Sequence, residues 1–232
     1  MGNPAVYAVI PARGGSKRVQ KKNLALIEGK PLFAYAVEVA KNCGIFREVL
    51  VNSDDKEILA AAANLTATPY RRPKHLGGDR VFIIEVIHEM IGTLGLADAD
   101  VLGILLPTCP LRTEADVLGA YQLFLEQGGE VPVVSVAGYD TPIQLAQFIG
   151  ADGRLDLVFP KDYRKSTRST DHQKAYRYNE AIIFNSVKNF KNQNNLIGER
   201  PFPYVVPLER SIALDYPYQM ELVRLLLAQR QN

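Results

Sequence analysis

Uninterrupted apolar runs recur along most of this 232-residue chain and alternate with segments of helical periodicity. The runs lack the polar alternation of a strand that has one face in water, and they lie at 5–10 (AVYAVI), 101–106 (VLGILL) and 131–136 (VPVVSV). Such runs are typical of strands that are buried on both faces of a parallel sheet. The chain is therefore expected to place helices on both sides of a central sheet.

The segments between these runs carry helix signals. Pro31 suits a first helical turn and Gly44 suits a helix end, so the sequence predicts a helix between them. A strand is expected at 48–54, followed by a helix at 55–64 that Ser53 or Asp54 would cap. A further helix is expected within 81–94.

Two later helices are also expected. Thr113 suits the cap of a helix that runs to about residue 127, and Gly128 would end it. The last helix would begin at Pro217 and run to about residue 228. Its inner face is expected to carry Tyr218, Leu222 and Leu225.

The alternation of strand and helix predicts an α/β fold, a Rossmann-like, doubly wound and mostly parallel sheet. We interpret residues 1–232 as one domain. The pattern breaks between 138 and 178, where short segments surround a GADGR turn, and it resumes with NEAIIF at 179–184. The break predicts an inserted hairpin or flap, and an exposed basic loop is the alternative.

Composition excludes several classes of protein. The net charge is only +2, which argues against a uniformly basic binder of nucleic acid. The two cysteines, Cys43 and Cys109, lie far apart without metal-ligand spacing, so a reduced, cytoplasmic setting is expected. Neither a signal peptide nor an apolar stretch of about 18 residues is evident, and no membrane partner is expected.

Positive charge gathers instead in one stretch at 9–23, VIPARGGSKRVQKKN. It carries five cations: Arg13, Lys17, Arg18, Lys21 and Lys22. Gly14 and Gly15 would let backbone amides approach an anion closely. The stretch follows the first strand, where open α/β sheets bind ligands. We expect it to bind phosphate, with two or three of the cations facing solvent; a solvated basic loop is the alternative.

The same stretch, with Lys22 and Asn23, resembles the signature of the sugar cytidylyltransferases, and most closely that of the CMP-sialic acid synthetases (acylneuraminate cytidylyltransferases). Further blocks of the chain agree with this family in order and spacing. They are VNSDD at 51–55, RRPKHLGGD at 71–79, LLPTCPLR at 105–112, YRYNEAIIF at 176–184 and SIALDYPYQMEL from 211.

The resemblance implies an enzyme in which a sugar hydroxyl attacks the α-phosphorus of CTP. Pyrophosphate would leave and a CMP-sugar would form, with Mg²⁺ as the cofactor. The acceptor would be an acidic nine-carbon (nonulosonic, sialic-acid-like) sugar. The resemblance also implies a homodimer that the inserted segment builds, with the partner reaching the sugar pocket.

The resemblance assigns roles to individual residues. Nucleotide binding would fall to Ala12, Arg13, Ser16, Lys22, Asn23, Arg72 and Thr108, and catalysis to Arg13, Lys22 and Asp215, with Asp215 also holding the metal. Alternatives remain open at several of these positions: Arg72 pairing at the surface with Asp79 or Asp54, Thr108 capping a turn, and Asp215 capping the last helix. For Arg112 a structural salt bridge is the alternative to ligand contact.

Three positions depart from the family pattern. Ala213 stands where the first closing aspartate is expected, Leu106 replaces a sugar-contacting Gln, and Gln144 replaces a Lys. The sugar would be bound by Leu106, Gln144, Arg168, Arg177 and Asn179. These departures suggest an acceptor other than N-acetylneuraminate: another nine-carbon keto sugar acid, such as a pseudaminic- or legionaminic-type sugar, or a smaller relative.

Three rival functions remain. One is a nucleotidyltransferase of the same fold with another acceptor, such as an eight-carbon keto sugar acid. Another is a non-catalytic nucleotide-binding homologue. An RNA-binding module is disfavoured, because the basic loops lack the interleaved aromatics of stacking platforms.

Overall fold

A seven-stranded sheet forms the centre of the computed structural model, which describes residues 4–16 and 19–230. Its strands are β1 (Val6–Pro11), β4 (Glu48–Ser53), β5 (Thr68–Arg71), β6 (Val101–Ile104), β7 (Val133–Gly138), β10 (Tyr176–Ser186) and β11 (Phe202–Val205). The strand order is β11-β7-β10-β6-β1-β4-β5, and every pairing is parallel except those of β10 with β6 and β7. The predicted mostly parallel sheet is confirmed.

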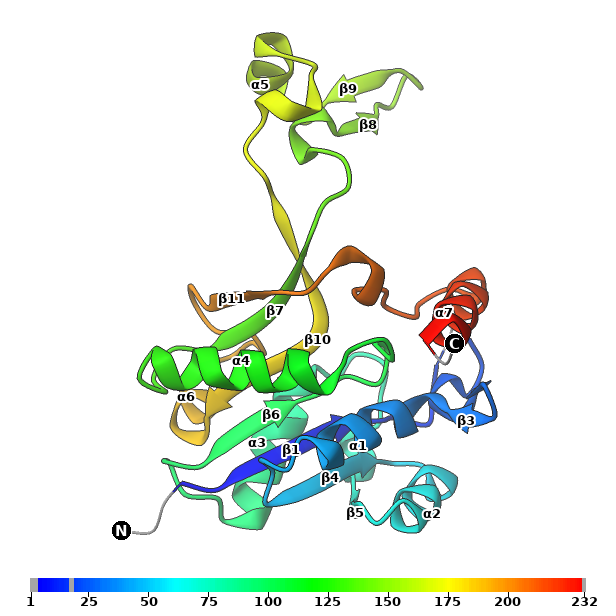
Figure 1. The fold of residues 1–232 in the computed structure, drawn as a ribbon, viewed down its shortest axis with the longest axis vertical. Helices are drawn as coiled ribbons and strands as arrows, with labels where there is room; N and C mark the ends of the chain where they lie inside the picture. Colours follow the sequence, from blue (N-terminus) through cyan, green and yellow to red (C-terminus); the bar gives the residue numbers. More distant parts are fainter. Residues whose placement is uncertain (1–3, 17–18, 231–232) are drawn as a thin grey trace.

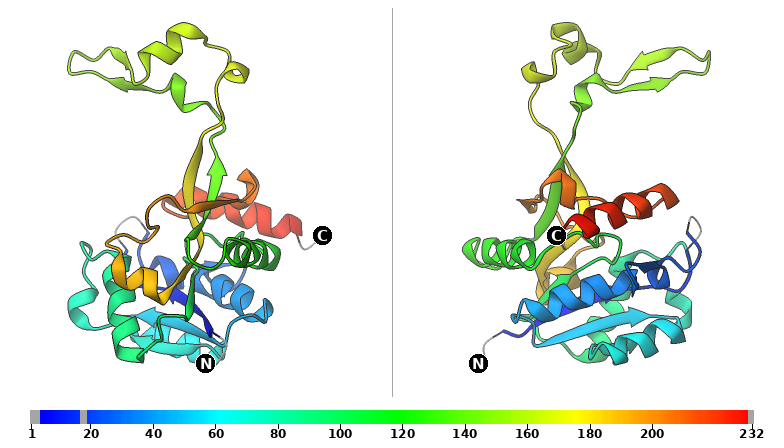
Figure 2. Two further views of the ribbon diagram at one scale, coloured as in Figure 1. Left: turned by 90° about the vertical axis from the view of Figure 1, so that its left-hand side faces the viewer. Right: turned by 45° about the vertical axis from the view of Figure 1, so that its right-hand side comes forward.

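Helices cover both faces of the sheet (Figures 1 and 2). One face packs against α1 (Leu32–Asn42), α2 (Lys56–Asn64) and α4 (Glu114–Glu126), and the other against α3 (Ile83–Leu94) and α6 (Val187–Asn192). Each face has its own apolar cluster, and the central strands β1 and β6 contribute to both. This burial on two sides explains the continuous apolar runs of the sequence.

Helix ends follow the expected capping chemistry at most positions. Pro31 precedes α1, and the Thr113 hydroxyl accepts a hydrogen bond from the backbone N–H of Asp116 in α4. The cap of α2 is Asp55, not Ser53 or Asp54 as the sequence suggested; its carboxylate accepts from two backbone N–H groups of the helix. Asp54 is unavailable for capping because its carboxylate accepts the N–H of Gly14.

The last helix, α7 (Pro217–Arg230), packs through a different face from the one predicted. Val223 and Leu227 are buried in a small cluster with residues of the β2 (Leu26–Ile27) and α1 segments. Tyr218 and Leu225 are instead 68% and 65% exposed, and Leu222 is also exposed. The helix carries apolar residues on two faces, and the surface available beside α1 selects the Val223 face.

Residues 139–175 leave the sheet as a flap. It contains a two-stranded hairpin, β8 (Gln147–Ile149) with β9 (Leu155–Leu157), and the short helix α5 (Pro160–Lys165). Figure 1 shows the flap standing away from the body, joined to it through the extended ends of β7 and β10. Short 3₁₀ turns are η1 (Lys22–Leu24), η2 (Lys74–Leu76), η3 (Ile143–Leu145), η4 (Ser169–Asp171) and η5 (Leu208–Arg210), and β3 (Lys30–Pro31) pairs with β2. None of the helices within the described residues has the length and apolar character that crossing a membrane requires.

Candidate functional site

A polar pocket of about 290 Å³ opens beyond the carboxyl ends of β1 and β6. It brings together distant parts of the chain: the loop after β1, the turn after β6, the start of β10 and the segment before α7. Its walls carry three cationic and three acidic side chains: Arg13, Lys22, Arg72, Asp79, Glu180 and Asp215. Ligands of open α/β sheets bind at this edge, so the pocket is the candidate active site.

The loop after β1 is fastened to the neighbouring strand. The backbone N–H of Gly14 donates to Asp54 Oδ1 at 2.9 Å, and a Cβ at Gly14 would lie 2.7 Å from the Cβ of Asp55. Glycine is therefore required here by close packing. The amide of Gly14 donates to a carboxylate in this conformation, and the expectation that the loop amides approach a phosphate stays a prediction.

The cations of the loop divide between pocket and solvent. Arg13 and Lys22 line the pocket, and Arg13 Nη1 donates to Asp79 Oδ1 at 2.9 Å. Lys21 instead pairs with the exposed Glu57 at 2.9 Å, which agrees with the expectation that some of the cations face solvent. Lys17 and Arg18, the other two cations of the predicted phosphate-binding stretch, lie outside the described residues.

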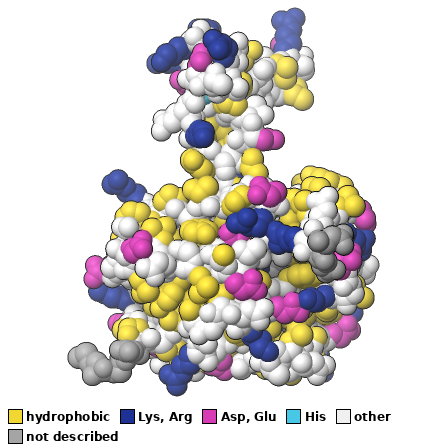
Figure 3. Space-filling view, in the orientation of Figure 1, with side chains coloured by type: hydrophobic (Ala, Val, Ile, Leu, Met, Phe, Trp, Pro, Cys, Tyr) yellow, Lys and Arg dark blue, Asp and Glu magenta, His cyan; other side chains and the backbone are white. Residues whose placement is uncertain are grey.

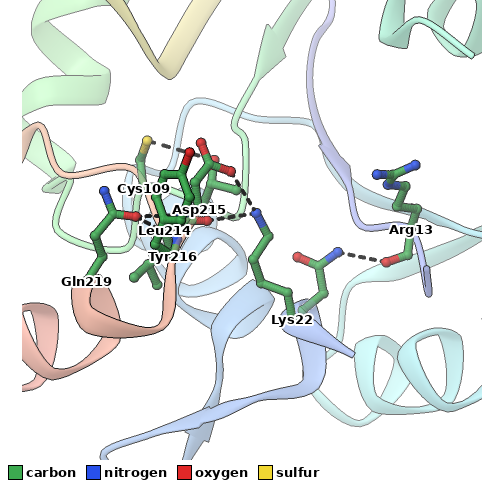
Figure 4. Close-up of polar contacts among 9 residues, drawn as sticks. Arg13, Lys22, Cys109, Leu214, Asp215, Tyr216 and Gln219 are labelled. Atoms are coloured by element: carbon green, nitrogen blue, oxygen red, sulfur yellow. Dashed lines mark hydrogen bonds and ion pairs between the residues drawn. The ribbon is translucent and has the colours of Figure 1, made fainter. Parts of the chain in front are cut away.

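Lys22 joins the loop to the segment before α7. Its Nζ donates to the Leu214 carbonyl at 2.7 Å and lies 3.3 Å from Asp215 Oδ1, and Figure 4 shows the side chain extending toward both. The Gln219 side chain accepts the backbone N–H groups of Asp215 and Tyr216 ahead of the helix. The Asp215 carboxylate thus lies beside Lys22 at the pocket, and its roles in metal binding and helix capping stay predictions.

Two other predicted nucleotide contacts, Asn23 and Thr108, also line the pocket. Asn23 Nδ2 donates to the Arg13 carbonyl at 2.8 Å, which holds the two ends of the loop together. The Thr108 carbonyl accepts the N–H of Leu214 at 2.8 Å. The turn after β6 and the segment before α7 are therefore fixed to each other where they meet the pocket. Ser16, another predicted nucleotide contact, also lines the pocket.

Arg72 lines the pocket with a buried side chain and not from the protein surface. The side chain is buried, and its Nε donates to Asn52 Oδ1 at 2.6 Å. Burial lowers the pKa of Arg72, and the nearby carboxylate of Asp54 opposes that shift. Asp79 is bound by Arg13. The alternative of a simple surface pair for Arg72 is therefore wrong.

Arg112 is a structural residue that shapes the pocket from outside it. The guanidinium is fully buried and donates to the backbone carbonyls of Leu106 and Ala181. Burial lowers its pKa to about 10. Leu106 lines the pocket and Ala181 follows the pocket residue Glu180. Arg112 therefore ties together two pocket walls through carbonyl oxygens, where the sequence had suggested a salt bridge or a ligand contact.

Cys109 lies in the same turn but is no nucleophile. Its Sγ donates to the Asn179 carbonyl at 3.1 Å, inside the core (Figure 4). Burial raises the pKa of the Cys109 thiol to about 11, although the positive charge of nearby Arg112 lowers it. The thiol thus stays protonated at neutral pH.

Glu180 is one of the pocket residues that the sequence did not single out; Asp79, Val81, Ile83 and Val86 are others. It has a left-handed backbone with φ 62°, at the point where the ladder between β10 and β7 is interrupted. Burial raises the pKa of Glu180, the Asp215 carboxylate raises it further, and Lys22 opposes both. The segment NEAIIF reads as strand, and nothing in that pattern indicates that Glu180 would turn out of it.

Several predicted site residues do not line the pocket. Ala12 is buried at the end of β1, and Asn179 is buried with its Oδ1 accepting from the Ala181 N–H. Arg177 Nη2 contacts Ser211 Oγ at 3.4 Å. Gln144 and Arg168 belong to the flap. Of the predicted sugar residues, the pocket of the single chain contains Leu106 alone.

The acidic residues of the pocket bear on metal binding. Across the described residues, no group of three or more His, Cys, Asp or Glu side chains could hold an ion by itself. Mg²⁺ commonly binds one or two carboxylates and takes its other ligands from phosphates and water. The carboxylate of Asp215, in a pocket that carries both cationic and acidic side chains, fits an ion of that kind.

Comparisons with known proteins agree with this geometry. A family model described as Cytidylyltransferase matches residues 7–92. The chain is 30% identical over 221 residues to a pseudaminic acid cytidylyltransferase of Campylobacter jejuni, covering 94% of each chain. It is 27% identical over 231 residues to a CMP-N,N'-diacetyllegionaminic acid synthase of Legionella pneumophila, covering 98% of each.

A solved structure extends the comparison to the fold. The CMP:2-keto-3-deoxy-manno-octonic acid synthetase, complexed with CTP, superposes with a TM-score of 0.71 at 18% identity, over 97% of this chain and 99% of that one. At this identity the match speaks for the fold alone. It covers the flap as well as the sheet.

Proposed function

Because the chain belongs to the sugar cytidylyltransferases of the sialic-acid synthetase type, we propose that it transfers CMP from CTP to an acidic nine-carbon sugar. The observation that carries the proposal is the pocket itself, which Arg13, Lys22 and Arg72 line together with Asp215. Three cations around one cavity suit a polyanionic ligand. A triphosphate that also brings a divalent cation would match both kinds of charge.

The proposed reaction exchanges one bond to phosphorus for another. The sugar hydroxyl oxygen forms a bond to the α-phosphorus, the bond from that phosphorus to the bridging oxygen breaks, and pyrophosphate leaves with the electron pair. The hydroxyl proton passes to solvent. Such reactions depend mainly on positioning and on neutralising charge as it develops.

Arg13 and Lys22 would neutralise the departing pyrophosphate. In the structure each is bound to a carboxylate, Arg13 to Asp79 and Lys22 to Asp215. Both carboxylate partners are partly exposed, so a bound triphosphate can take over these cations at little cost. Arg72 would lie deeper, where a fixed donor could read the base, because Asn52 holds its guanidinium in place.

Mg²⁺ is part of the proposal, with Asp215 as a ligand. When bound, the ion would supply positive charge to the phosphate oxygens and orient them. Lys22 holds the segment that carries Asp215 through the Leu214 carbonyl, so the loop and the metal ligand are positioned together.

For the acceptor, we propose a pseudaminic- or legionaminic-type sugar acid. Leu106 gives the pocket an apolar wall beside Thr108, where a polar side chain would suit a more hydroxylated sugar. The similarity to proteins named for those two sugars supports this choice. An eight-carbon keto sugar acid remains the second candidate, as the rival acceptor that the sequence left open.

The activity is tested by pyrophosphate release from CTP and Mg²⁺ over a panel of nine- and eight-carbon keto sugar acids. We expect release with CTP and a pseudaminic- or legionaminic-type acid, and much less with ATP, GTP or UTP. Release with the eight-carbon acid alone would contradict the proposed acceptor. CTP binding without release for any acid would favour the non-catalytic homologue.

The flap is proposed to build a homodimer, in a cytoplasmic protein. Apolar side chains are exposed on its hairpin, with Ile149 75% and Leu155 66% exposed. Figure 3 shows Lys and Arg side chains gathered at the tip of the flap beside such apolar residues. In a dimer, Gln144 and Arg168 of one copy could face the pocket of the other and complete the sugar site.

Light scattering tests the dimer. We expect a mass of twice the 25.7 kDa chain, and we expect Ile149→Asp to lower it toward one chain while CTP binding persists. A charge placed within a buried apolar contact costs several kcal/mol, on the order of the stability of a modest interface. A monomeric wild type, or an unaltered mass for the Ile149→Asp variant, would contradict this role of the hairpin.

A further inference from the structure

We propose that Glu180 is a second carboxylate ligand for the divalent cation, shared with Asp215. The inference rests on the proposed function and assigns a role that the sequence comparison did not suggest. Both residues line the same pocket although they lie 35 positions apart, Glu180 in β10 and Asp215 before α7. When phosphates and waters fill its other coordination positions, Mg²⁺ usually binds one or two carboxylates of a protein. Glu180 and Asp215 together would supply two.

The backbone at Glu180 is shaped to present this side chain. The pairing of β10 with β7 is regular up to Tyr178 and resumes at Ile183, and Glu180 has φ 62° within the interruption. An interruption of this kind re-aims a side chain out of a strand. The left-handed conformation is costly for a residue other than glycine. A glycine would avoid that cost, so the glutamate side chain is kept here against the local backbone preference.

The carboxylate of Glu180 lacks a counter-charge of its own. It makes no hydrogen bond or ion pair with any residue that the structure describes, although it is only partly exposed. Asp215 and Lys22 are both close enough to act on it electrostatically, and Lys22 already bonds to the Asp215 segment. One lysine thus faces two carboxylates. Once Lys22 turns to a bound triphosphate, a divalent cation would satisfy both.

The other candidates for a second ligand are excluded by their surroundings. Ala213 carries no donor, and its side chain packs against the main apolar cluster of the sheet. Asp79, the third acid of the pocket, is held by Arg13 at 2.9 Å. Glu180 is the acid in the described pocket whose carboxylate has no such partner.

The test measures metal binding directly. Mn²⁺ is titrated into wild type and the Glu180→Gln variant with CTP present and no acceptor, and free Mn²⁺ is followed by electron paramagnetic resonance. Loss of a direct ligand should weaken Mn²⁺ binding on the order of tenfold or more. Glu180→Gly, which removes the side chain and relieves the backbone, should show the same loss and melt no lower than wild type. Glu126→Gln, an exposed residue of α4, is the matched control and should bind Mn²⁺ as wild type does.

CTP binding in the presence of a chelator separates the two claims. We expect the affinity for CTP to be unchanged in Glu180→Gln under these conditions, because the contact between CTP and the cations of the pocket needs no metal. Mn²⁺ affinity equal to wild type in Glu180→Gln, with CTP bound normally, would overturn the ligand assignment alone. A wild type that binds Mn²⁺ through Glu180 but binds no CTP would overturn the proposed function and leave the assignment standing.

Discussion

Replacing Arg112 with alanine is expected to lower the free energy of unfolding by about 3–5 kcal/mol. The substitution leaves the buried carbonyls of Leu106 and Ala181 without their donor, at about 1–3 kcal/mol each, and opens a cavity where the side chain lay. The melting temperature should fall by roughly 10 °C for a chain of this size. Because both carbonyls belong to walls of the pocket, pyrophosphate release should fall as well.

Two further variants separate the causes. Arg112→Met keeps most of the side-chain volume, so it should remove the cavity cost and retain the loss from the two orphaned carbonyls, roughly 2–3 kcal/mol. Arg154→Ala, at an exposed pair with Asp152 on the flap, is the control and should stay within about 0.5 kcal/mol of wild type. Thermal denaturation measures all three. An Arg112→Ala protein that melts with wild type would show that the two carbonyls do not depend on the guanidinium.

Replacing Lys22 with methionine is expected to lower kcat by about 10²–10³, the usual loss when a group that stabilises developing charge is removed. Lys22 is the cation that reaches both the loop after β1 and the Asp215 segment. Methionine keeps the apolar stem and removes only the charge and its hydrogen bonds. Initial rates of pyrophosphate release over a range of CTP concentrations give kcat and KM separately.

Lys21 provides the matched control at the next position. Its ammonium pairs with exposed Glu57, and it does not line the pocket. Lys21→Met should therefore keep kcat within about twofold of wild type, because exposed ion pairs contribute little. Equal losses of kcat in Lys21→Met and Lys22→Met would mean that the total positive charge of the loop stabilises the leaving pyrophosphate. No particular cation would then face the leaving group.

The fold could be predicted in outline because its signals are local. Apolar runs marked most strands of the sheet but not the edge strand β5, whose sequence is TPYR, and the hydroxyl of Thr113 marked the start of α4. The packing of α7 could not be predicted in the same way. Tyr218, Leu222 and Leu225 form one apolar stripe, and Val223 with Leu227 forms another. Only the surface beside α1 decides which stripe is buried, and no local pattern contains that information.

The candidate site divides along similar lines. Arg13, Lys22 and Arg72 belong to motifs, and the structure brings them to one pocket. Glu180 could not be found, because its place depends on a break in the strand ladder and a backbone with positive φ. Gln144 and Arg168 lie on a flap that stands away from the pocket of its own chain. Their proposed sugar-binding role would need the second copy of the proposed homodimer, which a single sequence does not specify.

The central claim is that the α-phosphorus of CTP passes to the sugar. It is tested most directly with CTP labelled with ³²P at the α-position, incubated with Mg²⁺ and the acceptor that releases pyrophosphate. We expect the α-label to move into a CMP-sugar, with one mole of CMP-sugar formed for each mole of pyrophosphate. Label placed at the γ-position should stay with pyrophosphate. Label recovered as free CMP without sugar, or left in CTP, would contradict it.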